Sequence, residues 1–85
     1  MNKTIIININ GIVFHIEEDA YEVLRTYMTG VKRHFAYSAD SDEIVTDIEN
    51  RLAEMFSEKL KQDHKQVIIV EYVEYVTKKM GTVDD

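Results

Sequence analysis

The residues of this 85-residue chain that could carry acid–base or metal chemistry are few and scattered. Its three histidines fall in different segments, and none shows the i, i+4 spacing of a helical metal-binding pair. The closest histidine–carboxylate pair is His15 with Glu17, and residues two apart on a strand share a face. An isolated pair of this kind is usually structural, so we interpret His15 as a surface residue of a hairpin.

Signatures of an enzyme are also missing from the sequence. Gly11, Gly30 and Gly81 are isolated from one another, so there is no glycine-rich phosphate loop. The chain has no cysteine, and no serine lies in a nucleophile motif. The carboxylates are spread over predicted helix surfaces, as is typical of solvated faces. We therefore predict a non-enzymatic protein that uses no cofactor and no metal ion.

Lys32-Arg33-His34 is the only basic cluster in the sequence. The net charge of −6 and the pI near 4.9 argue against nucleic acid or anionic membranes as partners, because both favour basic proteins. We interpret Lys32, Arg33 and His34 as cations that complement the dipole at the C-terminal end of a helix. The alternative is that these three residues contact phosphates, as in a small DNA-binding or antitoxin-type regulator.

Residues 4–16 predict a β-hairpin. Asn10-Gly11 separates two β-branched runs and suits a two-residue type I′ turn, which needs positive φ at both central positions. This turn places three pairs of apolar side chains on one face: Ile5 with Ile16, Ile7 with Phe14, and Ile9 with Ile12. The opposite face is mixed in character and carries Ile6, Asn8, Val13 and His15. A hairpin with one apolar face needs a cover, which helices can provide.

Two amphipathic helices are predicted to cover the hairpin. The first follows three acidic residues at 17–19, and its apolar stripe is Ala20, Leu24, Tyr27, Met28, Val31 and Phe35. The second follows a loop over residues 37–42, and its stripe is Ile44, Ile48, Leu52, Met55, Phe56 and Leu60. We expect Ile7 and Phe14 to pack on this second stripe at Ile48 and Leu52.

Two local features of these helices carry further predictions. Asp40 and Glu43 are spaced as in a capping box at the start of the second helix. Gly30 lies inside the first helix, where glycine costs about 1 kcal/mol relative to alanine. We interpret Gly30 as a position where a neighbouring element packs closely against the helix.

The segment from residue 67 onward has two possible structures. Residues 67–70 form a β-branched run, and propensity alone would continue this strand to residue 76. However, the apolar spacing from residue 69 onward is helical and ends before a glycine suited to a helix C-terminus: Ile69, Val73, Val76 and Met80, then Gly81. We predict a short strand followed by a helix, and a frayed tail over residues 82–85.

The predicted fold is therefore α+β, in one small domain over residues 1–81. It has an N-terminal β-hairpin covered by two amphipathic helices, then a short strand and a C-terminal helix.

The segment from Val67 to Val76 also predicts self-association, because eight of its ten residues are apolar or aromatic. A domain of this size should bury only part of them and leave an exposed patch, and such patches mark interfaces. We expect a homodimer through the residues Ile69, Tyr72, Val73, Tyr75 and Val76.

Three segments of the chain together resemble the N-terminal cytoplasmic segment of PspC-domain (phage shock protein C type) envelope proteins of Bacteroidetes-like bacteria. These segments are residues 9–16 with 18–21, residues 31–35 and residues 42–56, and the resemblance extends over about residues 4–81. Where that family starts its last helix with a Thr and an Asp, this chain has Ile69 and Tyr72. The usual side-chain cap of that helix is therefore lost.

The resemblance implies a non-catalytic function. In the family, this segment precedes a membrane-embedded module linked to envelope-stress signalling, and that module has no counterpart in this chain. The implied function is a cytoplasmic protein-interaction or oligomerisation module of an envelope-stress regulator with an unidentified protein partner. Contact with the membrane, at the cytoplasmic face of the inner membrane, would come only through the absent downstream segment. The family has no catalytic residues to transfer to this sequence.

Overall fold

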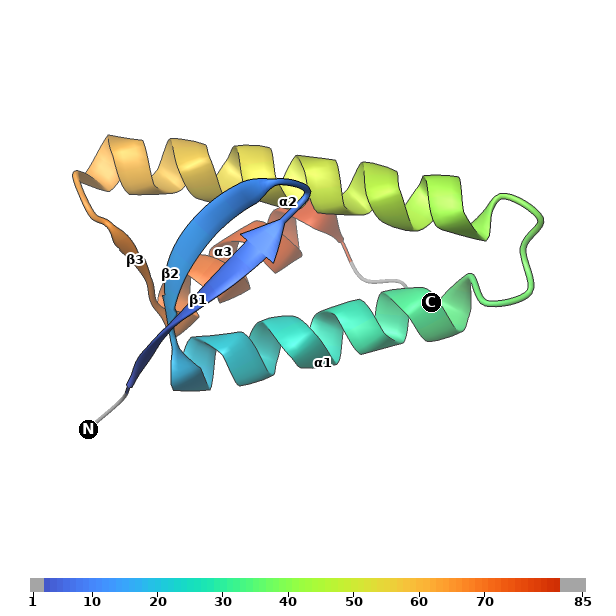
Figure 1. Cartoon of the computed structure of the whole chain (residues 1–85), viewed down its shortest axis with the longest axis horizontal. Helices are drawn as coiled ribbons and strands as arrows, with labels where there is room; N and C mark the ends of the chain where they lie inside the picture. The colour runs from blue at the N-terminus through green and yellow to red at the C-terminus, as the bar shows by residue number, and fades with distance from the viewer. Residues whose placement is uncertain (1–2, 82–85) are drawn as a thin grey trace.

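The computed structural model describes residues 3–81 and has an α+β fold, as the sequence predicts (Figure 1). The elements are β1 (Thr4–Ile9), β2 (Ile12–Glu17), α1 (Glu18–His34), α2 (Ser41–Asp63), β3 (Val67–Ile68) and α3 (Val70–Met80). The order of hairpin, two helices, short strand and helix is confirmed. The predicted tail at residues 82–85 lies outside the described residues.

The hairpin has the predicted turn and register. Asn10 and Gly11 have φ values of 52° and 88°, and the Asn8 Oδ1 atom accepts a hydrogen bond from the Gly11 N–H at 2.8 Å. The pairs run from Thr4 with Glu17 to Ile9 with Ile12, so alternation places every odd-numbered residue of β1 on the inner face. Ile12 is the exception on this apolar face, because it lies beside the turn and is 44% exposed.

The two strands of the hairpin have different surroundings. β3 pairs with β2 in parallel, with His15 opposite Val67 and Ile16 opposite Ile68. The sheet order is therefore β1-β2-β3, and β2 is the central strand. One side of β1 pairs with β2, and the other side pairs with no strand among residues 3–81, so it is a free edge of the described sheet.

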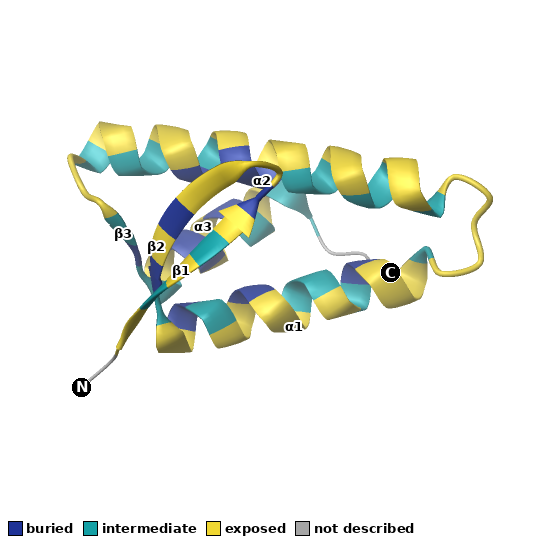
Figure 2. Ribbon diagram, viewed as in Figure 1, coloured by how far each residue is buried: buried dark blue, intermediate teal, exposed yellow. Residues whose placement is uncertain are grey.

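The core lies between the sheet and all three helices rather than two. α3 lies behind the hairpin in Figure 1 and packs against both α1 and α2. Figure 2 shows that buried residues line the inward sides of the helices and alternate along β2. The core side chains come from every element: Ile9, Phe14, Ile16, Ala20, Leu24, Leu52, Ala53, Phe56, Ile68, Tyr72, Val73 and Val76.

The apolar hairpin face meets α2 as expected, with one difference in position. The rings of Phe14 and Phe56 pack edge to face with their centroids 6.0 Å apart. Leu52 belongs to the same cluster, and Ile48 packs against it. The aromatic contact thus falls one helical turn beyond the predicted Ile48–Leu52 position. At the tip, the Asn10 side-chain amide donates to the Thr46 carbonyl and to Asn50, which joins the turn to α2.

The helix ends differ in part from the predictions. Asp40 is the N-cap of α2, but its side chain makes no capping hydrogen bond, so the predicted capping box is not formed. Ile69 is the N-cap of α3 and also lacks a side-chain cap, as expected for an aliphatic residue. Gly81, with φ of 86°, ends α3 as predicted. His64 ends α2 in the left-handed region with φ of 54°, where glycine is the usual residue.

Gly30 does not lie at a close helix contact. A Cβ atom built at this position would meet no heavy atom within 4 Å among the described residues. The interpretation of Gly30 as a packing glycine is therefore wrong for the contacts within residues 3–81.

Candidate functional site

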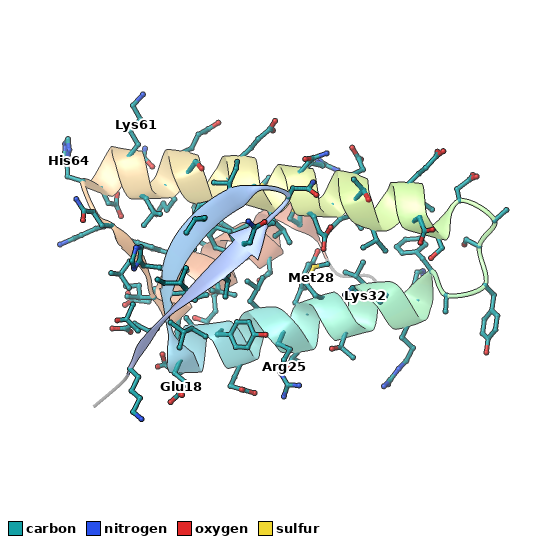
Figure 3. All side chains as sticks on the ribbon, in the orientation of Figure 1. Glu18, Arg25, Met28, Lys32, Lys61 and His64 are labelled. Carbon is teal, nitrogen blue, oxygen red and sulfur yellow. The ribbon has the colours of Figure 1, made fainter. Side chains whose placement is uncertain are left out.

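The three histidines remain apart in the fold. His15 is exposed on the outer face of the sheet, which it shares with Glu17. The His34 ring packs edge-on against Phe35 at 4.7 Å, and His64 lies at the end of α2 (Figure 3). Within residues 3–81, no three side chains of the metal-binding types lie close enough together to hold an ion.

The basic triplet is divided between two surfaces of α1. Arg33 and His34 line a shallow hollow of about 640 Å³ on the helix together with Arg25 and Gly30. Lys32 lines a different groove, which lies between α1 and β1. The three side chains are all exposed, and they line two different hollows, which share Arg25.

The exposed apolar patch predicted for residues 67–76 is not there. Val73 and Val76 are completely buried and Tyr72 is 7% exposed, because the crossover from α2 through β3 places α3 behind the hairpin. Ile69 is half-buried at the start of α3. Tyr75, which is 40% exposed, is the one predicted interface residue that solvent reaches freely. The three buried residues therefore belong to the core of a single chain.

The exposed ring of Tyr75 contacts two lysine side chains. The Lys59 and Lys79 ammonium groups lie 4.5 Å and 5.2 Å from the centre of its ring. These distances are within the range of cation–π contacts. Lys59 also lies 3.6 Å from the Asp63 carboxylate. This arrangement joins α2 to α3 and explains Tyr75 as a surface aromatic residue that already has partners.

Two tyrosines have raised pKa values, and both remain neutral near neutral pH. Burial raises the pKa of Tyr27, against a smaller opposing effect of Arg51, and its hydroxyl donates to the Gly81 carbonyl at 3.3 Å. Burial also raises the pKa of Tyr72, and the Asp63 and Glu71 carboxylates raise it further.

The free edge of β1 has the arrangement best suited to binding. Ile9 and Ile12 flank a two-residue turn, and such flanking residues exchange hydrogen bonds with each other. At the opposite end, the Glu18 N–H donates to the Lys3 carbonyl at 2.7 Å. Hydrogen-bonded and non-hydrogen-bonded residue pairs alternate along an antiparallel hairpin, so residues 3, 5, 7 and 9 direct their backbone N–H and C=O groups toward β2. Thr4, Ile6 and Asn8 therefore direct theirs outward, away from the hairpin.

This edge lacks three of the devices that prevent strands from pairing with other chains, namely charges, prolines and bulges. Natural edge strands carry charges, prolines or bulges. β1 has no charged residue and no proline from Thr4 to Ile9, and its register with β2 is continuous. Two apolar residues are exposed on the mixed outer face beside this edge, because Ile6 and Val13 are 66% and 58% exposed.

A groove of about 410 Å³ adjoins the same edge. One wall is β1, with Ile7 and Ile9, and the other is α1, with Leu24 and Met28. Figure 1 shows that β1 is the strand of the hairpin nearer to α1, and Figure 3 shows Met28 on the side of α1 toward the hairpin. Charged side chains also line the groove, among them Lys32 and Glu49. A backbone edge beside such a groove can hold an extended polypeptide by pairing with its main chain and receiving alternate side chains.

The sequence analysis missed this site, although one signal for it was available. The uncharged run TIIINI was interpreted only as half of a hairpin. β1 is an edge strand because β3 pairs with β2 rather than with β1. The sequence pattern of residues 67–68 does not specify which of the two strands β3 joins.

No helix within residues 3–81 is long and apolar enough to span a membrane. Comparison of the chain with protein-family models, with curated proteins and with solved structures gave no match.

Proposed function

We propose that this chain is a non-enzymatic protein-interaction module that binds an extended segment of another polypeptide along the free edge of β1. The proposal is carried by one observation: a six-residue edge strand without charge or proline lies beside a groove whose walls carry Ile7, Ile9, Leu24 and Met28 among polar residues. In the context implied by the sequence resemblance, the module would serve a PspC-type envelope-stress regulator on the cytoplasmic side.

Strand addition suits the features of this edge. The outward N–H and C=O groups of Thr4, Ile6 and Asn8 supply hydrogen bonds that do not depend on the partner's sequence. The groove then selects side chains at alternate positions of the partner. Binding of this kind uses a small surface, under about 1,200 Å² in total, which is the range of weak and transient complexes. Reversible binding suits a regulator.

Site-specific photocrosslinking tests the proposal. A benzophenone amino acid in place of Ile6, which is 66% exposed, would lie beside the bound segment. The same probe in place of Lys61, which projects from the far side of α2 in Figure 3, is the matched control. In the native host, we expect a crosslinked protein product from position 6 and not from position 61.

The dependence on the β1 edge provides the second part of the test. Thr4→Pro removes an outward N–H without removing a hydrogen bond of the hairpin, so the domain should stay folded while the crosslink at position 6 is lost. If position 6 gives no product, or if both positions give the same products, the proposed function is wrong.

A further inference from the structure

The floor of the groove beside β1 is partly apolar, although Arg25, Lys32 and Glu49 also line the groove. Ile7, Leu24 and Met28 face it from the two walls, and Leu24 is only 4% exposed. A strand added to β1 would lie about 4.8 Å from it, over this floor. Every second side chain of the added strand would then enter the groove, where apolar atoms of Ile7 and Met28 are available for contact. The groove-facing positions of the bound segment should therefore be apolar.

The position of α1 favours a single extended segment over a second copy of this chain. α1 begins where β1 begins, since the Glu18 N–H is bonded to the Lys3 carbonyl, and it forms the outer wall of the groove. A two-fold pairing of β1 with β1 would bring a second α1 helix to the same edge. A strand without an attached helix needs only the space between β1 and α1.

One cation in this groove has no partner within the described residues. Arg25 lines the groove, but its guanidinium is 3.2 Å from the Glu22 carboxylate. Lys32 lines the groove without an ion pair or hydrogen bond among residues 3–81. Glu49 lines it as well, and no ion pair within 4 Å joins it to Lys32. Lys32 lies toward the hairpin-tip end of the groove in Figure 3.

We propose that the segment bound by β1 runs antiparallel to it, is apolar at the positions facing the groove, and has a carboxylate at its N-terminal end opposite Lys32. This inference rests on the proposed function and names the class of partner. Antiparallel pairing is the more stable arrangement per residue, and it places the N-terminal end of the segment beside the hairpin tip.

Binding of designed peptides tests the inference. The probes are fluorescent eight-residue peptides in which valine alternates with threonine, with one aspartate at the N-terminal end, one aspartate at the C-terminal end, or one lysine at the N-terminal end. Fluorescence anisotropy with the full chain measures their affinities. The N-terminal aspartate peptide should bind about three- to fivefold more tightly than either of the others, the expected effect of one exposed ion pair.

Two pairs of variants assign the effect to the site. Lys32→Glu should reverse the preference, so that the N-terminal lysine peptide binds best, while Lys61→Glu on the far side of α2 should change nothing. Ile6→Pro removes an outward N–H and should reduce the affinity for all peptides at least tenfold, whereas Ile6→Val keeps that N–H and should bind as the wild type does. Circular dichroism checks that each variant is folded, and Thr4→Pro replaces Ile6→Pro if the latter unfolds.

Several results would overturn the inference: no peptide binds, the three peptides bind equally, or Lys32→Glu leaves the order of affinities unchanged. Binding that survives both edge prolines would overturn it too. A specific crosslink from position 6 combined with any of these results would leave the proposed function in place and reject only the class of partner. Absence of that crosslink would reject the proposed function itself.

Discussion

Truncating Phe14 should unfold this domain or nearly so. Phe14 is 4% exposed and packs edge-on against the fully buried ring of Phe56 at 6.0 Å. Replacing a buried phenylalanine with alanine costs about 3–5 kcal/mol, through lost burial and the cavity left behind. A chain of this length has a free energy of unfolding of roughly 4–13 kcal/mol. Phe14→Ala should therefore remove a large part of it.

Urea denaturation followed by circular dichroism measures this loss. With a slope near 1 kcal/mol per molar urea, as expected for a small domain, the midpoint should fall by about 3 M or leave no folded baseline. Val13→Ala is the matched control, because Val13 is the adjacent residue on the opposite face and is 58% exposed. Its cost should stay under about 0.5 kcal/mol.

A double-mutant cycle isolates the contact between the two rings. The variants Phe14→Leu, Phe56→Leu and the double variant keep most of the apolar volume, so they should remain folded. We expect a coupling energy of about 0.5–1.5 kcal/mol, the usual value for an edge-to-face aromatic pair. A coupling near zero, or a Phe14→Ala variant that loses less than about 1 kcal/mol, would refute the assignment of Phe14 to the core.

Substitutions at Gly30, His64, Tyr27 and Tyr72 test other features of the structure by the same urea assay. Gly30→Ala should stabilise the domain by about 0.4–1 kcal/mol, because the added methyl group meets nothing within 4 Å and α1 gains helix propensity. A loss of stability would mean that the methyl group clashes with a neighbour, against the packing described above. His64→Gly should stabilise it by about 0.5–1 kcal/mol by relieving the left-handed conformation at the end of α2, whereas His64→Val should destabilise it. The pKa values of Tyr27 and Tyr72 are raised above the ordinary 10.0, so the stability that the two neutral phenols contribute is complete below pH 10 and is lost as the pH rises beyond it. Tyr72→Phe should lessen this loss of stability at alkaline pH. An unchanged loss in both Tyr→Phe variants would contradict the assignment of raised pKa values.

The hairpin and the helices were predictable because the interactions that form them are local. The Asn10-Gly11 turn fixes the pairing of its flanking strands, and that pairing fixes which residues share a face. The helix ending at Gly81 could be predicted from a spacing of three and four that overrides β propensity. The capping box failed for a local reason as well, because a spacing shows only that a hydrogen bond could form, and the Asp40 side chain does not make it.

The burial of α3 and the free edge of β1 depended on contacts between segments that are distant in the sequence. The sequence identified the apolar stripe of α3 but could not say whether it faced solvent, a second copy or the core. Pairing of Val67 and Ile68 with β2 decided this, since it turned α3 behind the hairpin and buried Val73 and Val76. The same pairing made β2 central and left β1 free. The elements of this protein follow from its sequence because turns and periodicity act over a few residues. The candidate binding edge follows only from the tertiary structure, because the free side of a strand is set by the partner that the other strand finds some fifty residues away.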